Sequence, residues 1–142
     1  MAQKLDELPV YIAAKAFWVA VNAILETPRL RRDRRLYDQI SRAADSITAN
    51  MGEGFEQSTD RAFAGFLVHA KASLAEVLVR LDQARHKEYI TEKELKRLND
   101  AGTTLAGMIG GFIKYLRACD WKDRGSFKVR QSLHPRDPTE PS

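Results

Sequence analysis

The chain has 142 residues, which fits one domain with a single hydrophobic core, and its 44% hydrophobic and 30% charged residues are typical of a globular protein. No uninterrupted apolar run reaches the roughly 18 residues that a membrane span requires, and the N-terminus lacks the charged-then-apolar order of a signal peptide, so we expect a cytoplasmic protein without membrane contact. The formal charge of +4 and the pI near 9.3 point mildly toward polyanionic partners.

The cysteine and histidine content gives no pattern typical of a metal site. Cys119 is the single cysteine, so it cannot form an intramolecular disulfide, and no Cys or His stands near it at zinc-ligand spacing. A di-iron bundle would need Glu-x-x-His on two helices, but the residues three positions before the histidines are phenylalanine or glutamine. We therefore expect no metal and no other cofactor.

Four apolar stripes at spacings of three and four residues predict four long helices. Thr27–Pro28 stops the first helix, any side chain of Ser58–Asp60 can cap the third, and Thr91–Glu94 has the sequence of a capping box for the fourth. The predicted helices cover residues 9–26, 34–52, 59–87 and 91–118. Short connections between them predict an all-α, antiparallel up-and-down four-helix bundle in a single domain, residues 1–118. Residues 119–142 form a basic, proline-containing tail.

Two features of this bundle predict self-association. Trp18 lies beside the apolar stripe of the first helix, either at the edge of the core or in an oligomer contact. The last helix contains four glycines, each of which costs about 1 kcal/mol relative to alanine at an exposed helical position. Such a cost suggests that another backbone packs closely there, within the bundle or across a subunit boundary. The four positions are Gly102, Gly107, Gly110 and Gly111.

The densest basic cluster precedes the second helix, in a segment that we expect to be a loop. It consists of Arg29, Arg31, Arg32, Arg34 and Arg35, relieved only by Asp33. Two interpretations are open: a solvated connection, or a phosphate-binding patch, for which the planar fork of arginine is well suited. The tail adds basic residues interleaved with aromatics, which could stack on unpaired bases or pack on the bundle. These residues are Lys122, Arg124, Lys128 and Arg130.

The turn between the second and third helices carries polar residues at regular spacing. Gly52 and Gly54 are expected to end the second helix, because glycine reaches the left-handed conformation that helix C-terminal caps use. We expect Asn50 and Glu53 to hold this junction by hydrogen bonds, with Ser73 and Glu76 of the third helix near it. The whole motif comprises Asn50, Gly52, Glu53, Gly54, Ser73 and Glu76. Glu53 and Glu76 could form a catalytic carboxylate pair, but no nucleophile or partner base accompanies them, so we interpret them as structural.

A set of residues around this turn resembles a known family signature. The set comprises Gln39–Ile40, Arg42–Ala44, Ser46–Ile47, Asn50, Glu53–Gly54, Ser73 and Glu76. It is similar to the signature of the small four-helix-bundle proteins encoded in intervening sequences of bacterial 23S ribosomal RNA genes, which are related to the accessory variability protein of diversity-generating retroelements. The resemblance spans roughly Leu8 to Leu116. It implies a ring-shaped homo-oligomer, with a pentamer as the expected form, and makes a retroelement reverse transcriptase a candidate partner.

Two classes of function remain, and neither is enzymatic. The first is an oligomeric adaptor that binds RNA, DNA or a nucleoprotein through its arginine-rich surface. The second is a protein-interaction bundle whose positive charge is incidental. Salt-dependent binding to nucleic acid separates the two classes, because phosphate contacts weaken steeply as counterions are added.

Overall fold

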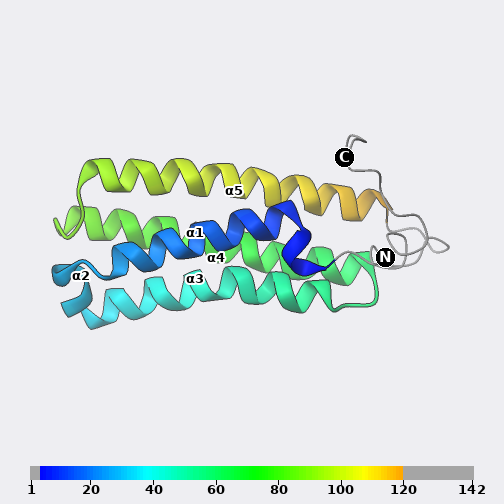
Figure 1. Cartoon of the computed structure of the whole chain (residues 1–142), viewed down its shortest axis with the longest axis horizontal. Coiled ribbons are helices and arrows are strands. Elements are labelled where there is room, and N and C mark those ends of the chain that lie inside the picture. Colours follow the sequence, from blue (N-terminus) through cyan, green and yellow to red (C-terminus); the bar gives the residue numbers. More distant parts are fainter. Residues whose placement is uncertain (1–3, 120–142) are drawn as a thin grey trace.

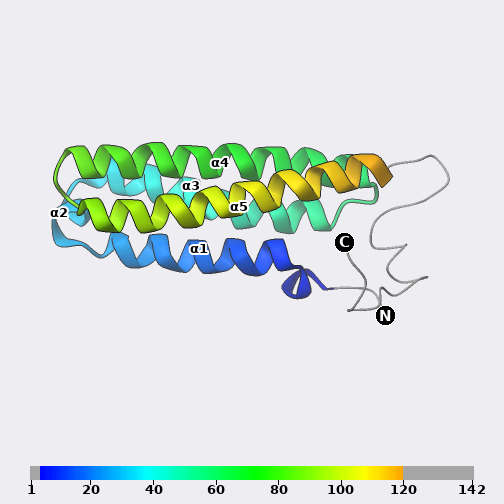
Figure 2. The same ribbon diagram turned by 90° about the horizontal axis from the view of Figure 1, so that it is seen from above.

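The structure is a computed structural model that describes residues 4–119. Its elements in chain order are η1 (Leu5–Glu7), α1 (Pro9–Leu25), α2 (Pro28–Arg32), α3 (Arg34–Phe55), α4 (Asp60–His86) and α5 (Glu92–Cys119). The four long helices α1, α3, α4 and α5 lie side by side along one axis, and each runs antiparallel to the next (Figures 1 and 2). The prediction of an all-α, up-and-down bundle is confirmed.

The core is a single apolar cluster to which all four long helices contribute. Helix α3 packs most extensively on α4, and α5 closes the bundle between α4 and α1. Residues at three- and four-residue spacing, such as Ile40, Ile47 and Met51 of α3, are almost completely buried. The periodicity of the sequence therefore places one side of each helix in the core.

The ends of two helices follow their predicted caps. The Thr59 hydroxyl accepts a hydrogen bond from the Ala62 N–H at 3.1 Å and so caps α4. At the start of α5, the Glu94 N–H donates to the Thr91 hydroxyl at 3.1 Å, and the Glu94 carboxylate accepts from the Thr91 N–H at 2.9 Å. The capping box predicted for Thr91–Glu94 is confirmed.

The role predicted for the glycines at the end of α3 is wrong. The helix continues through Gly52 and Gly54 to Phe55, and its C-cap residue Glu56 has ordinary right-handed torsions, φ −80° and ψ −6°. Gly54 serves packing, because a Cβ there would lie 2.8 Å from both Phe63 Cδ1 and Phe66 Cβ of α4. Glycine therefore permits close approach of α3 and α4 rather than a left-handed turn.

The glycines of α5 divide into two kinds. A Cβ on Gly102 would lie 2.7 Å from Leu78 Cδ2, so this glycine permits close packing on α4 inside the bundle. A Cβ on Gly107 or Gly111 would meet no atom beyond its own stretch of helix within 4 Å in residues 4–119, and a Cβ on Gly110 would lie 3.3 Å from the end of the flexible Lys71 side chain. Packing within one subunit thus accounts for Gly102 and leaves the later glycines on an open surface.

Trp18 lies at the edge of the core. Its ring is partly buried, and its Nε1–H donates to Asp45 Oδ1 of α3 at 2.7 Å. The contact ties α1 to α3 and agrees with the core-edge interpretation.

Helix α4 modifies the expectation that no apolar stretch reaches membrane-spanning length. Its 27 residues include an 18-residue window with a mean hydropathy of 1.5, sufficient by length and composition alone. The average is high because small and branched apolar residues, including Ala72, Ala75 and Val79, stand on the outer side of the helix as well as on the core side. A core helix of a bundle meets the same criterion.

Candidate nucleic-acid interface

The arginine segment, Arg29, Arg31, Arg32, Arg34 and Arg35, forms a short helix and the first turn of a long one. The sequence predicts a loop here, but Pro28 begins α2 and Asp33 separates α2 from α3. Leu30 and Leu36 are almost completely buried in the core, at 0% and 3% exposure. These two anchors turn all five arginines outward, where they are exposed.

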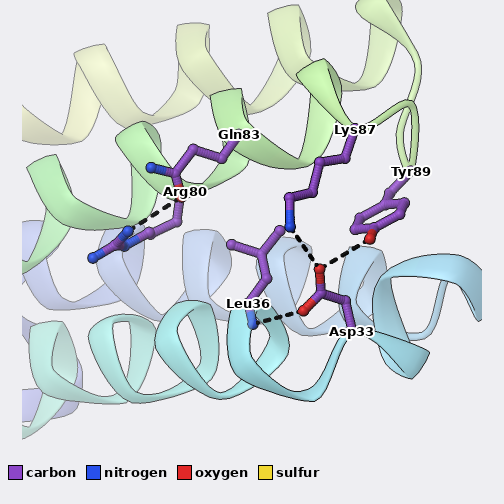
Figure 3. Close-up of polar contacts among 6 residues, drawn as sticks. All are labelled: Asp33, Leu36, Arg80, Gln83, Lys87 and Tyr89. Atoms are coloured by element: carbon purple, nitrogen blue, oxygen red, sulfur yellow. Dashed lines mark hydrogen bonds and ion pairs between the residues drawn. The ribbon is translucent and has the colours of Figure 1, made fainter.

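Asp33 fixes the arginine segment to the third connection of the bundle, which is the turn between α4 and α5. Its Oδ1 accepts from the Leu36 N–H at 3.2 Å, which caps α3. Its Oδ2 accepts from Lys87 Nζ at 3.0 Å and from the Tyr89 hydroxyl at 2.9 Å. Figure 3 shows both side chains pointing from the end of α4 and the following turn toward the start of α3. We call this set, Asp33, Leu36, Lys87 and Tyr89, the Asp33 junction.

The junction shifts the titration of its three ionisable members. The hydrogen bond from Lys87, together with those from the Leu36 N–H and Tyr89, lowers the pKa of Asp33. The same contact raises the pKa of Lys87, because the carboxylate stabilises the ammonium form. Donation to Asp33 also raises the pKa of Tyr89, because the hydrogen bond needs the phenol proton. The junction is therefore complete when Asp33 is ionised and Lys87 and Tyr89 are protonated.

The turn after α4 presents Lys87 and Tyr89 at the required place. The Tyr89 N–H donates to the Ala84 carbonyl and the Glu88 N–H to the Arg85 carbonyl, both at 2.9 Å, which is the Schellman pattern of helix termination. Glu88 has a φ of 62° and is the one non-glycine residue with positive φ in residues 4–119. The left-handed residue reverses the chain so that Tyr89 turns back over the arginine segment.

The arginines differ in what holds them. Arg29 donates to the Glu88 carbonyl at 3.2 Å and lies over the Tyr89 ring, 5.6 Å from its centroid. Two others face carboxylates: Arg31 lies 3.3 Å from Glu26, and Arg34 lies 3.7 Å from Asp38 and over the Tyr37 ring.

The side chains of Arg32 and Arg35 are exposed and make no hydrogen bond or ion pair with any residue of the described chain. Five arginines and one aspartate give residues 28–35 a formal charge of +4. The two unpaired guanidinium groups can bind phosphate oxygens without first giving up a carboxylate partner.

Sequence reasoning did not include the contribution of the third connection. Lys87 and Arg85 stand at the same end of the bundle as the arginine segment, because α1 ends and α5 begins there (Figure 1). The signal was available, since the first and third connections of an up-and-down bundle share an end. The four tail cations, Lys122, Arg124, Lys128 and Arg130, lie outside the described residues.

The polar motif of α3 and α4 does not form one site, and its uncharged members are linked through Ser46. The Asn50 amide donates to the Ser46 carbonyl at 2.8 Å and to the Ser46 hydroxyl at 2.9 Å, and Ser73 Oγ of α4 lies 2.8 Å from that hydroxyl. These contacts link the two helices across their interface. Ser46 takes part in all three of these contacts, although the sequence analysis did not assign it to the turn between α3 and α4.

The two carboxylates of the motif stand apart from this link and from each other. Glu53 is exposed and contributes only its backbone carbonyl, which accepts from the Gln57 amide at 3.1 Å. Since Ser46 lies beside Ser73, Glu76 is about ten residues, or about 15 Å, along the axis from the level of Glu53. Glu76 lies 3.9 Å from Arg80, which donates to Gln83 on the same helix (Figure 3). Hence the two carboxylates do not share a site.

No group of three or more His, Cys, Asp and Glu side chains within residues 4–119 is arranged to hold a metal ion. At the arginine end, exposed guanidinium groups that can bind anionic oxygens stand beside a fixed lysine and two tyrosine rings.

Comparisons with known proteins agree with the fold and identify a family. A crystal structure of a protein of unknown function from the S23 ribosomal protein family of Bacteroides thetaiotaomicron superposes with a TM-score of 0.68 at 24% identity, covering 74% of this chain and 98% of that one. This likeness shows the fold. No curated protein matches the chain. The family model described as 23S rRNA-intervening sequence protein matches residues 6–111, most of the chain, and the chain therefore belongs to that family.

Proposed function

We propose that this protein is a non-enzymatic, self-associating adaptor that binds nucleic acid through the arginine segment. The observation that carries the proposal is the pair of exposed, unpaired guanidinium groups of Arg32 and Arg35 within a segment of formal charge +4. Concentrated positive charge attracts a phosphate backbone and releases its condensed counterions. Glu53 and Glu76 have no catalytic role in this proposal.

The fixed backbone around the arginines favours binding. The buried anchor Leu30 and the Asp33 junction hold α2 against the bundle, so the arginines project from an ordered support. Ordering a flexible loop on binding would cost about 1–2 kcal/mol per residue in backbone entropy, and a helical segment has already lost that freedom. The aromatic rings of Tyr37 and Tyr89 lie beneath Arg34 and Arg29, which helps to keep those side chains in place.

Self-association would multiply a weak single contact. A ring of copies, for which the family resemblance suggests five subunits, would repeat the arginine segment around its axis and raise the effective concentration of each further contact. The family description names 23S rRNA and makes RNA the first probe to use. A retroelement reverse transcriptase is a second candidate partner, supported by the resemblance alone.

The test measures retention of a labelled single-stranded RNA, and of a DNA of the same sequence, over a range of salt concentrations. Because the contacts are to phosphates, we expect little sequence preference and a loss of log K of about 0.7 per phosphate contact for each tenfold rise in salt. Replacing Arg31, Arg32, Arg34 and Arg35 with glutamine should abolish retention and leave helicity and mass unchanged. If the wild-type protein retains neither RNA nor DNA at low salt, the adaptor function is wrong and the protein-interaction bundle replaces it.

A further inference from the structure

A shallow groove runs along the outer side of α4 and α5, away from the arginine segment. Its floor consists of small residues, namely Ala72, Ala75, Ala106, Gly107, Gly110 and Gly111. Val68 stands at its edge with 42% of its surface exposed. An open apolar floor at which two backbones are uncovered allows close approach of another helix. We call this surface the α4–α5 groove.

The charged residues that line the α4–α5 groove are all cations. They are Lys71 of α4 and Lys114 and Arg117 of α5, and no aspartate or glutamate lines the groove. Each of the three is exposed and makes no ion pair with a described residue. From Ala101 to Cys119, α5 contains no acidic residue at all. The groove thus combines an apolar floor with uncompensated positive charge.

The outer face of α3 has the opposite charge. From residue 42 onward its exposed positions recur at helical spacing and are Arg42, Asp45, Ala49, Glu53 and, just after the helix, Glu56. Three carboxylates and one arginine give this face a formal charge of −2. Glu53 is exposed and its carboxylate makes no contact with a described residue, while the small Ala49 stands between the charges. We call it the α3 acidic face.

We infer that the α4–α5 groove receives the α3 acidic face of a second copy of this chain. The inference rests on the self-association in the proposed function and names the two surfaces that meet. The spacings of the opposite charges are similar. Asp45 and Glu53 are about 12 Å apart along α3. Lys71 Nζ lies beside Gly110, and Gly110 and Arg117 are about 10 Å apart along α5. Ala49 would then lie between the two charge contacts, near Ile113, where its small side chain permits close approach of the two helices.

This pairing joins two different surfaces, so each copy has a free groove at one side and a free acidic face at the other. Such a head-to-tail contact closes into a ring when the rotation between copies permits, and otherwise propagates. It leaves the arginine segment uncovered on every copy, because neither surface includes residues 28–35. Nucleic-acid binding and assembly would therefore use separate residues.

Charge reversal tests the pairing by sedimentation and light scattering of the full chain at micromolar concentration. Lys71→Glu with Arg117→Glu, which reverses the two cations matched to Asp45 and Glu53, should reduce the mass from a multiple of 16.1 kDa to about 16.1 kDa. Asp45→Lys with Glu53→Lys should do the same. The chain that carries all four substitutions should recover the wild-type mass, because its acidic groove again faces a basic α3. Trp18→Phe is the control for Asp45, since it removes the hydrogen bond to that carboxylate without reversing a charge.

Three outcomes would overturn the inference. One is a wild-type mass near 16.1 kDa; another is an unchanged mass after reversal of the groove; the third is a fourfold variant that is helical by circular dichroism but stays monomeric. If groove reversal lowers RNA retention at unchanged mass, the groove is a nucleic-acid surface instead. A failure of RNA binding can be told apart from a failure of this inference. Without RNA binding, the wild-type mass and the effects of the charge reversals on the mass would be unchanged.

Discussion

Lys87 at the end of α4 and Asp33 at the start of α3 are 54 residues apart in the sequence, yet Nζ lies 3.0 Å from Oδ2. The side chain of Asp33 is only 17% exposed, whereas that of Lys87 is 54% exposed. The contact joins the first and third connections of the bundle and fixes the support from which the arginines project. Because the contact depends on the charge of Asp33, its contribution to stability should change with pH.

Asp33→Asn should lower the melting temperature near neutral pH. Asparagine can still cap α3, so the variant removes the negative charge while keeping the cap. Because the folded pKa of Asp33 is lowered, the stability that its charge contributes is present above the unfolded pKa of about 3.9 and is lost as the pH falls through the folded pKa. The difference between wild type and variant in a thermal melt should therefore be largest above about pH 5 and shrink in acid.

Asp38→Asn is the matched control for that experiment. Asp38 is on the same helix, but its contact is a more exposed ion pair with Arg34 at 3.7 Å. Exposed pairs contribute little, about 0–1 kcal/mol. An equal loss in both variants, or a pH-independent loss in Asp33→Asn, would contradict the assigned role of the junction.

Ser46→Ala should destabilise the protein more than Glu53→Ala. Removing the Ser46 hydroxyl takes a partner from the partly buried Asn50 amide and from Ser73, at a cost of about 1–3 kcal/mol. Glu53 is exposed, so its truncation should change the free energy of unfolding by no more than about 0.5 kcal/mol. Urea titration of both variants measures the change in the free energy of unfolding. A larger loss for Glu53→Ala would support the sequence-based expectation that Glu53 holds the turn between α3 and α4.

The helices were predictable from the sequence because each apolar stripe is long and regular and the caps are local. The capping box of Thr91–Glu94 depends on four adjacent residues, and it was confirmed. The role of Gly54 was mistaken because glycine permits both a left-handed turn and close packing, and only the position of Phe63 on another helix decides between them.

The candidate nucleic-acid interface was predictable only in part, because it too depends on contacts between residues that are far apart in the sequence. The arginine segment is contiguous and was identified, but its helical form depends on burial of Leu30 in a core built by other helices. Lys87 and Tyr89 join it through the topology of the chain and through the left-handed Glu88, which no local propensity indicates.

Gly54→Ala should destabilise the α3–α4 interface. The added methyl group would meet the Phe63 ring and Phe66 Cβ at 2.8 Å, and overpacking of this kind costs about 1–3 kcal/mol. Gly52→Ala is the control in the same turn: its Cβ would have an ordinary contact of 3.7 Å with Leu5, and the better helix former should add up to about 1 kcal/mol. Equal melting temperatures for the two variants would argue against the packing role of Gly54.

Glu88→Gly should stabilise the protein. Glu88 holds a φ of 62°, which costs an L-residue about 1–2 kcal/mol, whereas the greater freedom of glycine in the unfolded chain costs about 0.5–1 kcal/mol. The net gain should be about 0.5–1 kcal/mol in the free energy of unfolding by urea titration. A loss of stability would mean that the Glu88 side chain contributes more than its backbone strain.

The most direct test of nucleic-acid binding compares two pairs of arginines that differ in their partners. Arg32→Gln with Arg35→Gln removes the two unpaired guanidinium groups, whereas Arg31→Gln with Arg34→Gln removes the same charge from groups that already face Glu26 and Asp38. In a salt titration of single-stranded RNA binding, the first pair should lower affinity more and reduce the slope of log K against log salt by about 1.4 for two lost contacts. Equal slopes for wild type and the Arg32/Arg35 variant would contradict binding through this segment.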